Sequence, residues 1–268
     1  MNKIFDCITF FDENLQAELR FNILFDFVEK FIVCESIYDH MGNYKGAKFN
    51  IDTFQKFKSK IIHLVIKDKF PDISSPWITQ AHQREYIFNG LKEADENDYI
   101  MFSDPDEIPK PEILKNLNLK KKYGIFLQEM FCYKLNIYNQ FESPWEGTRV
   151  SLKKNLNSID FLRQKVLRKN LRYPFWRFDK ERNIQLFNDA GWHFNYLKKP
   201  QQISLKLKTF AHTEFNKEQF TDIKKIENNI NNLRDLFNRN HIYSKVDIDN
   251  SFPEYIVKNK DIFKDWIV

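Results

Sequence analysis

The organisation of the chain is best approached from one stretch, Tyr99-Ile100-Met101-Phe102-Ser103-Asp104-Pro105-Asp106-Glu107-Ile108-Pro109. A short apolar run flanked by turn residues is typical of a buried β-strand. This run ends in three carboxylates within four residues, and buried carboxylates are costly unless a cation compensates them. A hard divalent cation, bound by oxygen ligands at the carboxyl end of the strand, is the simplest compensator. A polar loop closed by a proline turn is the alternative interpretation.

The composition is that of a globular protein. The chain has 268 residues and is 16% aromatic, with 27 phenylalanines, so it can build a sizeable core. Charged residues make up 29% and glycines number only 6, which argues against a disordered or low-complexity chain. The net formal charge of +5 is mild, so it permits an anionic partner without requiring one.

The cysteines and the N-terminus bear on where the protein works. Cys7, Cys34 and Cys132 are far apart in apolar runs, which predicts buried thiols in a reducing compartment. The first residues contain no long apolar region, and no run approaches the ~18 apolar residues of a membrane span. We therefore expect a soluble cytoplasmic protein, with peripheral association at the inner face of a membrane as a further option.

The first half of the chain alternates between two hydrophobic patterns. Short apolar runs at 4–11, 31–34, 61–66 and 99–103 predict buried strands. Leu15, Leu19, Ile23 and Phe27 recur every four residues, which predicts a helix that Asp12 can cap. A second helix is expected from residue 77 to residue 94. This alternation predicts an α/β fold with a parallel sheet.

Polar residues follow two of these predicted strands. Glu35 and Ser36 come directly after the second strand, and the acidic cluster follows residue 103. Ligands of parallel α/β sheets bind at the carboxyl ends of the strands. A basic loop at 37–50, which contains Lys45, lies between two of them. The coincidence strengthens the prediction of a binding site at this edge.

The second half of the chain is less regular. Residues 124–135 form a long apolar run with Gln128 and Glu129 inside it, and a buried acid needs either a catalytic role or a charge partner. Residues 153–182 mix basic and aromatic side chains. Such a mixture suits single-stranded nucleic acid, sugars or phosphates, and it is equally typical of a solvated amphipathic surface.

Further along, His193 lies among aromatic residues, where it is either a core histidine or a ligand. Residues 220–237 have the periodicity of an amphipathic helix, and the tail from residue 253 carries enough apolar side chains to dock on the body. We find no internal repeat and no linker. One domain with C-terminal additions is therefore the economical interpretation.

Five blocks of the chain, taken in order, carry a family resemblance. They are residues 11–15 with Glu18 and Arg20, residues 31–36 with Gly42 and Lys45, residues 104–109, residues 191–193, and residues 253–255 with Asn259 and Phe263. Together they resemble the conserved blocks of glycosyltransferase family 17, including its D-x-D-E-I-P and G-W-H sequences.

The resemblance implies a fold and an activity. The fold is a single GT-A-type, Rossmann-like α/β domain with a mostly parallel central sheet and C-terminal helical additions. Residues 1–110 would form the nucleotide-sugar-binding half and residues 111–268 the acceptor-binding half. The activity is metal-dependent, inverting transfer of a sugar, GlcNAc from UDP-GlcNAc above all, to a glycan or glycolipid. The basic segment is compatible with an anionic acceptor.

The resemblance also implies roles for particular residues. The metal, Mn²⁺ or Mg²⁺, would be bound by Asp104, Asp106 and His193. An inverting transfer needs a general base for the acceptor hydroxyl, and Glu214 and Glu129 are the candidates. The donor would be bound by Glu35, Ser36, Lys45, Arg84, Asp104 and Lys199.

Two other functions remain open from the residues themselves. A nucleic-acid-binding protein could use the basic, aromatic segment 153–182. However, the mild net charge and the 37 acidic residues argue against it, so we expect no nucleic-acid partner. A nucleotidyltransferase or nucleotide-sugar hydrolase could use the same acidic cluster for different chemistry.

Overall fold

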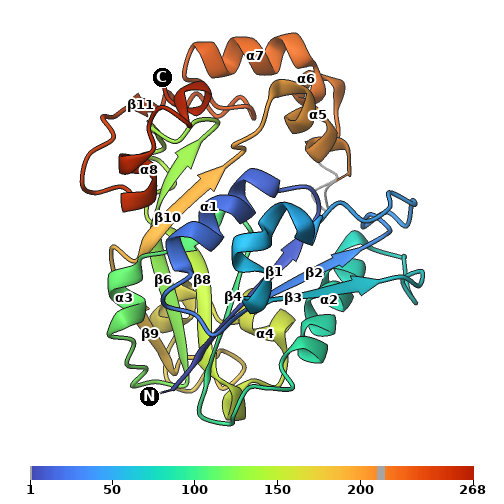
Figure 1. Ribbon diagram of the computed structural model, residues 1–268, viewed down its shortest axis with the longest axis vertical. Coiled ribbons are helices and arrows are strands. Elements are labelled where there is room, and N and C mark those ends of the chain that lie inside the picture. Colours follow the sequence, from blue (N-terminus) through green and yellow to red (C-terminus); the bar gives the residue numbers. More distant parts are fainter. Residues whose placement is uncertain (1, 210–214) are drawn as a thin grey trace.

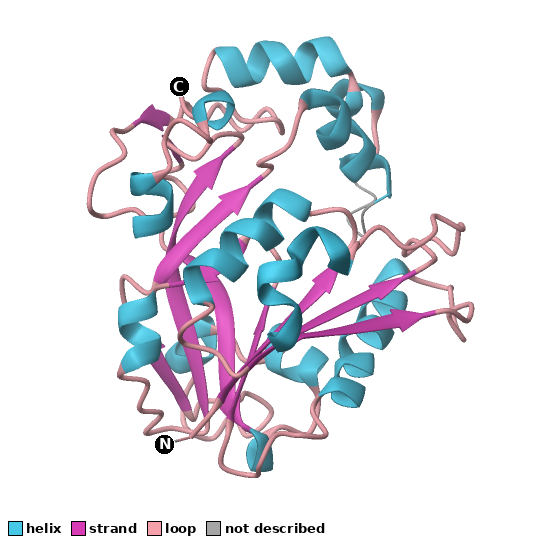
Figure 2. Ribbon diagram, in the orientation of Figure 1, coloured by secondary structure: helices cyan, strands magenta, loops and turns pink. Residues whose placement is uncertain are grey.

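A computed structural model of the chain describes residues 2–209 and 215–268. In this part of the chain an 11-stranded sheet runs through the molecule, with the order β11-β7-β6-β8-β4-β1-β2-β3 (Figures 1 and 2). Strands β9 and β10 also pair with β6, and β5 pairs with β10. The strands are β1 (Ile4–Phe10), β2 (Lys30–Ser36), β3 (Ile61–Ile66), β4 (Tyr99–Ser103), β5 (Glu107–Pro109), β6 (Tyr123–Cys132), β7 (Ile137–Tyr138), β8 (Trp145–Leu152), β9 (Ile184–Phe187), β10 (Gly191–Asn195) and β11 (Ser244–Lys245).

Helices cover the sheet and form a separate group beyond the ends of the strands (Figure 1). The α-helices are α1 (Asn14–Leu24), α2 (Pro76–Tyr86), α3 (Pro111–Lys115), α4 (Ile159–Gln164), α5 (Pro200–Thr209), α6 (Glu218–Thr221), α7 (Ile223–Asn231) and α8 (Glu254–Lys258). Short 3-10 helices are η1 (Ile51–Lys60), η2 (Ile87–Gly90), η3 (Lys153–Asn155), η4 (Arg168–Arg172) and η6 (Lys264–Trp266). Within the described residues no helix is long and apolar enough to cross a membrane.

The sheet is parallel where the sequence alternates between strands and helices. Strands β3, β2, β1 and β4 run in the same direction, and β8 then lies antiparallel between β4 and β6. Farther on, β6 pairs in parallel with β9 and β10 and antiparallel with β7. The predicted α/β fold with a parallel sheet in the first half of the chain is confirmed. The functional division of the chain near residue 110 stays a prediction, since one sheet continues through both parts.

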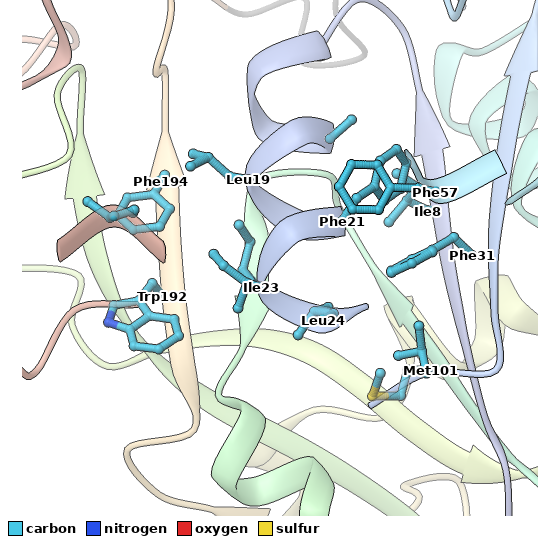
Figure 3. Packing of buried hydrophobic residues seen from close by; sticks show 14 of the residues in the cluster. Ile8, Leu19, Phe21, Ile23, Leu24, Phe31, Phe57, Met101, Trp192 and Phe194 are labelled. Carbon is cyan, nitrogen blue, oxygen red and sulfur yellow. The ribbon is translucent and has the colours of Figure 1, made fainter. Parts of the chain in front are cut away.

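Helix α1 packs its apolar residues between two parts of the sheet. Figure 3 shows Phe21 beside Phe31 and Phe57, while Leu19 and Ile23 extend toward Phe194 and Trp192 of β10. The ring centroids of Phe21 and Phe31 are 4.8 Å apart. This helix therefore ties β10, from the far half of the sequence, to the parallel strands.

The opposite face of the parallel strands is covered by α2, η2 and α4. Strand alternation sends Phe5 and Cys7 of β1 to this face, where they join Ile87 of η2 and Leu162 of α4 in a second apolar cluster. Cys7, Cys34 and Cys132 are buried and free, as the sequence predicts. The two apolar clusters, one on each face of the parallel strands, thus fix the position of the polar residues at the ends of these strands.

Glycine is required where β10 meets β5. Gly191 has a φ of +151°, and a Cβ there would lie 2.2 Å from the carbonyl oxygen of Ile108 and 2.9 Å from the Cα of Pro109. The close approach fixes an antiparallel register in which His193 lies opposite Glu107. The glycine of the G-W-H block therefore places the histidine next to the acidic cluster.

Several boundaries differ from the predictions. The helix expected over residues 77–94 ends as an α-helix at Tyr86 and continues as η2. The helix expected over 220–237 is divided into α6 and α7, because Asp222 has an extended backbone (ψ 121°) and its side chain caps α7 by accepting a hydrogen bond from the Lys225 amide. Asp12 does not cap α1, since Glu13 occupies the N-cap position.

Candidate active site

The acidic residues form a turn that begins where β4 ends. The Glu107 amide donates to the Asp104 carbonyl at 3.0 Å, and the Asp104 amide donates to Oε2 of Glu107 at 3.0 Å. The backbone and the side chain of Glu107 therefore close the turn from both sides. This arrangement leaves the carboxylates of Asp104 and Asp106 in the wall of a cavity.

A buried arginine supports the turn from below. Arg20 of α1 is fully buried and pairs with Asp6 of β1, at 2.6 Å through Nε and 2.5 Å through Nη2. The same guanidinium donates to the Ser103 hydroxyl at 2.8 Å and to the Glu107 carbonyl at 2.5 Å. It thus joins α1, β1 and both ends of the acidic turn through charge-assisted hydrogen bonds.

A second arginine compensates the acids from the opposite side. Arg163 of α4 donates to Oδ2 of Asp104 at 2.5 Å and to Oε1 of Glu107 at 2.7 Å. Trp145 also donates its indole N–H to Glu107, at 2.7 Å. Glu107 is fully buried, so its charge is matched inside the protein and its role is to shape the turn.

Asp106 faces a different group of partners. Its Oδ1 lies 3.5 Å from Nε2 of His193, and its Oδ2 lies 3.6 Å from Nζ of Lys206 on α5. The Phe194 amide donates to the Asp106 carbonyl at 2.8 Å, which binds β10 to the turn. Nδ1 of His193 is buried and has no hydrogen-bond partner among residues 2–209 and 215–268.

Both aspartates are held in their charged form. Burial alone raises the pKa of Asp106, but the Lys206 ammonium and His193 outweigh it, so the pKa lies below its ordinary value. Burial likewise raises the pKa of Asp104, and the guanidinium groups of Arg163 and Arg84 more than reverse this effect. The site therefore combines fixed negative charge with surrounding positive charge at neutral pH.

These residues line a cavity of about 890 Å³. One part of the wall comes from the first half of the chain, and it includes Phe11, Lys45 and Arg84 of α2. The opposite part comes from the second half of the chain, and it includes Tyr196, Lys206, Phe237 and Arg239. Asp104 and Asp106 of the acidic turn also line the cavity. A volume of this size is typical of small-molecule and cofactor sites.

The structure places several predicted site residues in this cavity. Lys45, Arg84, Asp104, Asp106 and His193 all line it. Lys45 lies 4.8 Å from the ring centroid of Phe11, and Nη1 of Arg84 donates to Asp160 at 2.7 Å. Nε of Arg84 is buried, and no described residue is its hydrogen-bond partner. The geometry thus brings these residues together, although their roles stay predictions.

Glu35 and Ser36, two of the predicted donor ligands, form hydrogen bonds within the protein. Glu35 is fully buried, accepts hydrogen bonds from the Lys48 and Phe49 amides, and lies 2.9 Å from Nε2 of His63. It therefore anchors the loop that carries Lys45, whose Nζ is 3.8 Å away. Ser36 is also buried, and its hydroxyl accepts from an amide two residues on. Neither side chain lines the cavity, because both are engaged in holding the loop.

Lys199 and the candidate base Glu129 do not line the cavity. Lys199 is exposed outside the cavity, while its neighbour Lys198 is buried and pairs with Asp12. Glu129 does not line the cavity, since strand alternation turns its neighbour Met130 inward. Burial, followed by repulsion from Asp189, raises the pKa of Glu129. Glu214 lies outside the described residues.

The sequence did not identify several residues of the cavity wall. Arg163 was one of many basic residues in the segment 153–182, and Lys206 had no motif around it. Glu142 and Glu146 also line the cavity, with side chains 27% and 31% exposed.

Asp106 and His193 are two candidate ligands for a divalent metal. Asp106 and His193 supply a carboxylate oxygen and an imidazole nitrogen within 3.5 Å of each other, and the second nitrogen of His193 lacks a partner in the described part of the chain. These ligand types suit Mn²⁺ or Mg²⁺ only if other oxygens complete the shell. Across residues 2–209 and 215–268, no group of three His, Cys, Asp or Glu residues is arranged to hold a metal. Asp104, the third member of the predicted trio, is instead paired with Arg163 at 2.5 Å.

Comparison with known sequences decides the family. Residues 1–263 match the sequence profile of glycosyltransferase family 17. The chain belongs to that family. The family blocks noted in the sequence include the acidic turn, Arg20 beneath it and His193 beside it, so the resemblance coincides with the structural centre of the cavity.

Curated relatives of this family-17 chain are mammalian enzymes. It is 24% identical over 280 residues to the beta-1,4-mannosyl-glycoprotein 4-beta-N-acetylglucosaminyltransferase of Rattus norvegicus. It is also 24% identical over 279 residues to the Homo sapiens enzyme of the same name. Each match covers 92% of this chain and 51% of the relative. The chain therefore spans about half the length of the curated relatives it matches.

Solved structures show weaker similarity to this family-17 chain. HddC from Yersinia pseudotuberculosis has a TM-score of 0.39 at 12% identity, covering 73% of this chain and 91% of that one. TarS from S. aureus has a TM-score of 0.35 at 12% identity, covering 86% and 71%. Nothing about the site follows from similarities of this size.

Proposed function

We propose that the protein transfers a sugar, GlcNAc from UDP-GlcNAc, to a hydroxyl of a glycan or glycolipid with inversion at the sugar. The observation that carries the proposal is the shared cavity: two charged aspartates lie there among Lys45, Arg84 and Lys206. A nucleotide diphosphate is an anion that both cations and a carboxylate-bound metal can bind. Family membership supports the same class of chemistry.

Asp106 and His193 are the residues that would hold the metal in this proposal. When bound, Mn²⁺ or Mg²⁺ would act as a Lewis acid toward the diphosphate leaving group. Two protein ligands leave positions for diphosphate oxygens and water. Asp104, held by Arg163, would then orient the donor beside the metal.

The protein's own cations would stabilise the charge of the leaving group. Arg84 has a buried Nε with no hydrogen-bond partner among the residues that the structure describes, so a phosphate oxygen could satisfy it. Lys206 is next to Asp106, where the negative field raises its pKa despite burial. Positive groups fixed before the reaction cost no reorganisation as the sugar–phosphate bond breaks.

The general base belongs on the acceptor side of the cavity. Glu214 remains the candidate from the sequence, and Glu129 does not, because it does not line the cavity. Among the described residues, Glu142 and Glu146 are carboxylates that line the cavity, although Glu142 is paired with Arg239 at 2.9 Å. Glutamine substitutions at the three positions would separate them, since loss of the base lowers kcat with little effect on KM for the donor.

A ligand-stabilisation screen tests the proposal. The Tm of the protein would be measured with UDP-GlcNAc, UDP-glucose and free UDP, each with and without Mn²⁺. We expect UDP-GlcNAc to raise the Tm most, and more strongly with Mn²⁺ present. The Asp106→Asn variant, which keeps the size of the side chain, should lose the metal-dependent part of the shift.

Other results would overturn the proposal. No stabilisation by any nucleotide sugar at millimolar concentration would exclude this donor class. A metal-dependent shift that survives unchanged in Asp106→Asn would exclude the assigned ligand. Release of free GlcNAc at the same rate with and without acceptors would indicate a nucleotide-sugar hydrolase.

A further inference from the structure

One loop outside the cavity exposes large apolar rings to solvent. Phe175, Trp176 and Phe178 are 76%, 61% and 92% exposed, and they lie between η4 and β9. All residues from 174 to 179 are exposed, so no other described part of the chain covers these rings. Adjacent apolar rings of this exposure are unfavourable in water, which indicates that something else contacts them.

The surrounding segment, residues 165–182, carries a net positive charge. Residues 165–182 contain seven basic and two acidic residues, a net of +5, which equals the net formal charge of the whole chain. The rest of the protein is therefore neutral overall. The mild average charge conceals a local concentration next to the exposed rings.

Contacts inside the segment leave most of this charge available. Asp179 is paired with Arg177 at 2.7 Å and with Lys180 at 3.2 Å, so one acid is shared by two cations. Lys165, Lys169 and Arg172 are exposed. The surface thus presents cations around a group of apolar rings.

We propose that residues 165–182 dock the protein on the surface of a bilayer that contains anionic lipid. Phenylalanine and tryptophan rings partition into the boundary between headgroups and acyl chains. Lysine and arginine side chains attract anionic headgroups, and neither element alone gives stable anchoring. This segment contains both elements within 18 residues.

The geometry favours a bilayer over single-stranded nucleic acid. Nucleic-acid sites stack bases on flat aromatic faces along a basic groove. Here the rings of Phe175 and Trp176 meet edge to face, with an interplanar angle of 79° and centroids 5.1 Å apart. The pair therefore forms an apolar protrusion instead of parallel platforms, which suits insertion among lipids.

Docking would also orient the cavity. Arg163, Leu167 and Lys169 line the cavity and belong to the chain segment that leads directly into the loop. A bilayer contacting the loop would therefore lie near that wall. The inference itself does not depend on sugar transfer, because it rests on exposure and charge outside the cavity.

Vesicle sedimentation of the full chain tests the inference. Vesicles of phosphatidylcholine alone would be compared with vesicles that also contain phosphatidylglycerol. We expect binding to the anionic vesicles only, weakening with added salt. The triple variant Phe175→Ser, Trp176→Ser and Phe178→Ser should bind at least tenfold more weakly, and Arg172→Ser about fivefold more weakly.

Matched controls separate docking from misfolding. Ile262→Ser removes an apolar side chain that is 66% exposed elsewhere, and it should leave vesicle binding unchanged. The Tm of every variant should match the parent, because the substituted side chains are exposed. Equal binding of the triple variant and the parent, absence of binding to anionic vesicles, or tighter binding to single-stranded RNA than to vesicles would overturn the inference.

Discussion

Replacing Arg20 by methionine tests how the acidic turn is held. The parent guanidinium makes two short bonds to Asp6, at 2.6 and 2.5 Å, with both side chains at most 1% exposed. Methionine fills similar space but leaves Asp6 buried without its cation. Breaking a buried pair in this way costs about 3–5 kcal/mol, so we expect the free energy of unfolding to fall by about that amount.

The double variant Asp6→Leu and Arg20→Met provides the decisive comparison. It removes both charges, so the unpaired acid no longer penalises the folded state, and it should recover much of the stability lost in Arg20→Met. Urea unfolding monitored by circular dichroism gives both free energies. Arg172→Met, at an exposed arginine, should change stability by less than about 0.5 kcal/mol.

A small effect would refute this reasoning. If Arg20→Met costs less than about 1 kcal/mol, the four contacts of Arg20 do not constrain the turn. If the double variant is as unstable as Arg20→Met, the cost arises from Ser103 and the Glu107 carbonyl and not from the stranded carboxylate. Either result would require a different account of how α1 supports the site.

Three further predictions follow from single positions. Gly191→Ala should cost about 2 kcal/mol or more in urea unfolding, because its Cβ would meet the Ile108 carbonyl; an unchanged midpoint would contradict the tight β5–β10 pairing. Glu129→Gln should leave turnover unchanged. Since burial raises the pKa of Glu129 above its unfolded value, its charge penalises the folded state at neutral pH. The variant's gain in stability should therefore shrink as the pH falls through the raised pKa and be absent below about 4, and a loss of turnover would restore Glu129 as the base. Lys45→Met should raise KM for the donor about tenfold, and an unchanged KM would remove Lys45 from the donor site.

Hydrophobic patterning predicted the elements that local sequence determines. The predicted apolar runs at 4–11, 31–34, 61–66 and 99–103 coincide with the parallel strands β1 to β4, because buried β-strands depend on short uninterrupted apolar segments. The helix expected over 220–237 failed as one element because Asp222 favours a cap over continuation. Periodicity alone does not report such competition.

The candidate site was predictable only in part, for reasons of distance and direction. The blocks containing Asp106 and His193 carried family patterns, and the structure brings the two within 3.5 Å. Arg163 and Lys206 contact the aspartates from remote elements, and no local pattern reports a tertiary ion pair. Glu129 failed because strand alternation alone does not specify which face of the strand points toward the cavity.

The most direct test of the central claim is transfer itself. UDP-GlcNAc would be incubated with the protein, Mn²⁺ and a panel of glycan and glycolipid acceptors, and products would be identified by mass spectrometry. We expect an acceptor that gains one N-acetylhexosamine, with at least a hundredfold loss of product in Asp106→Asn under conditions where circular dichroism shows that the variant is folded. Full activity of Asp106→Asn, or free GlcNAc or transferred nucleotide in place of a glycosidic product, would contradict the claim.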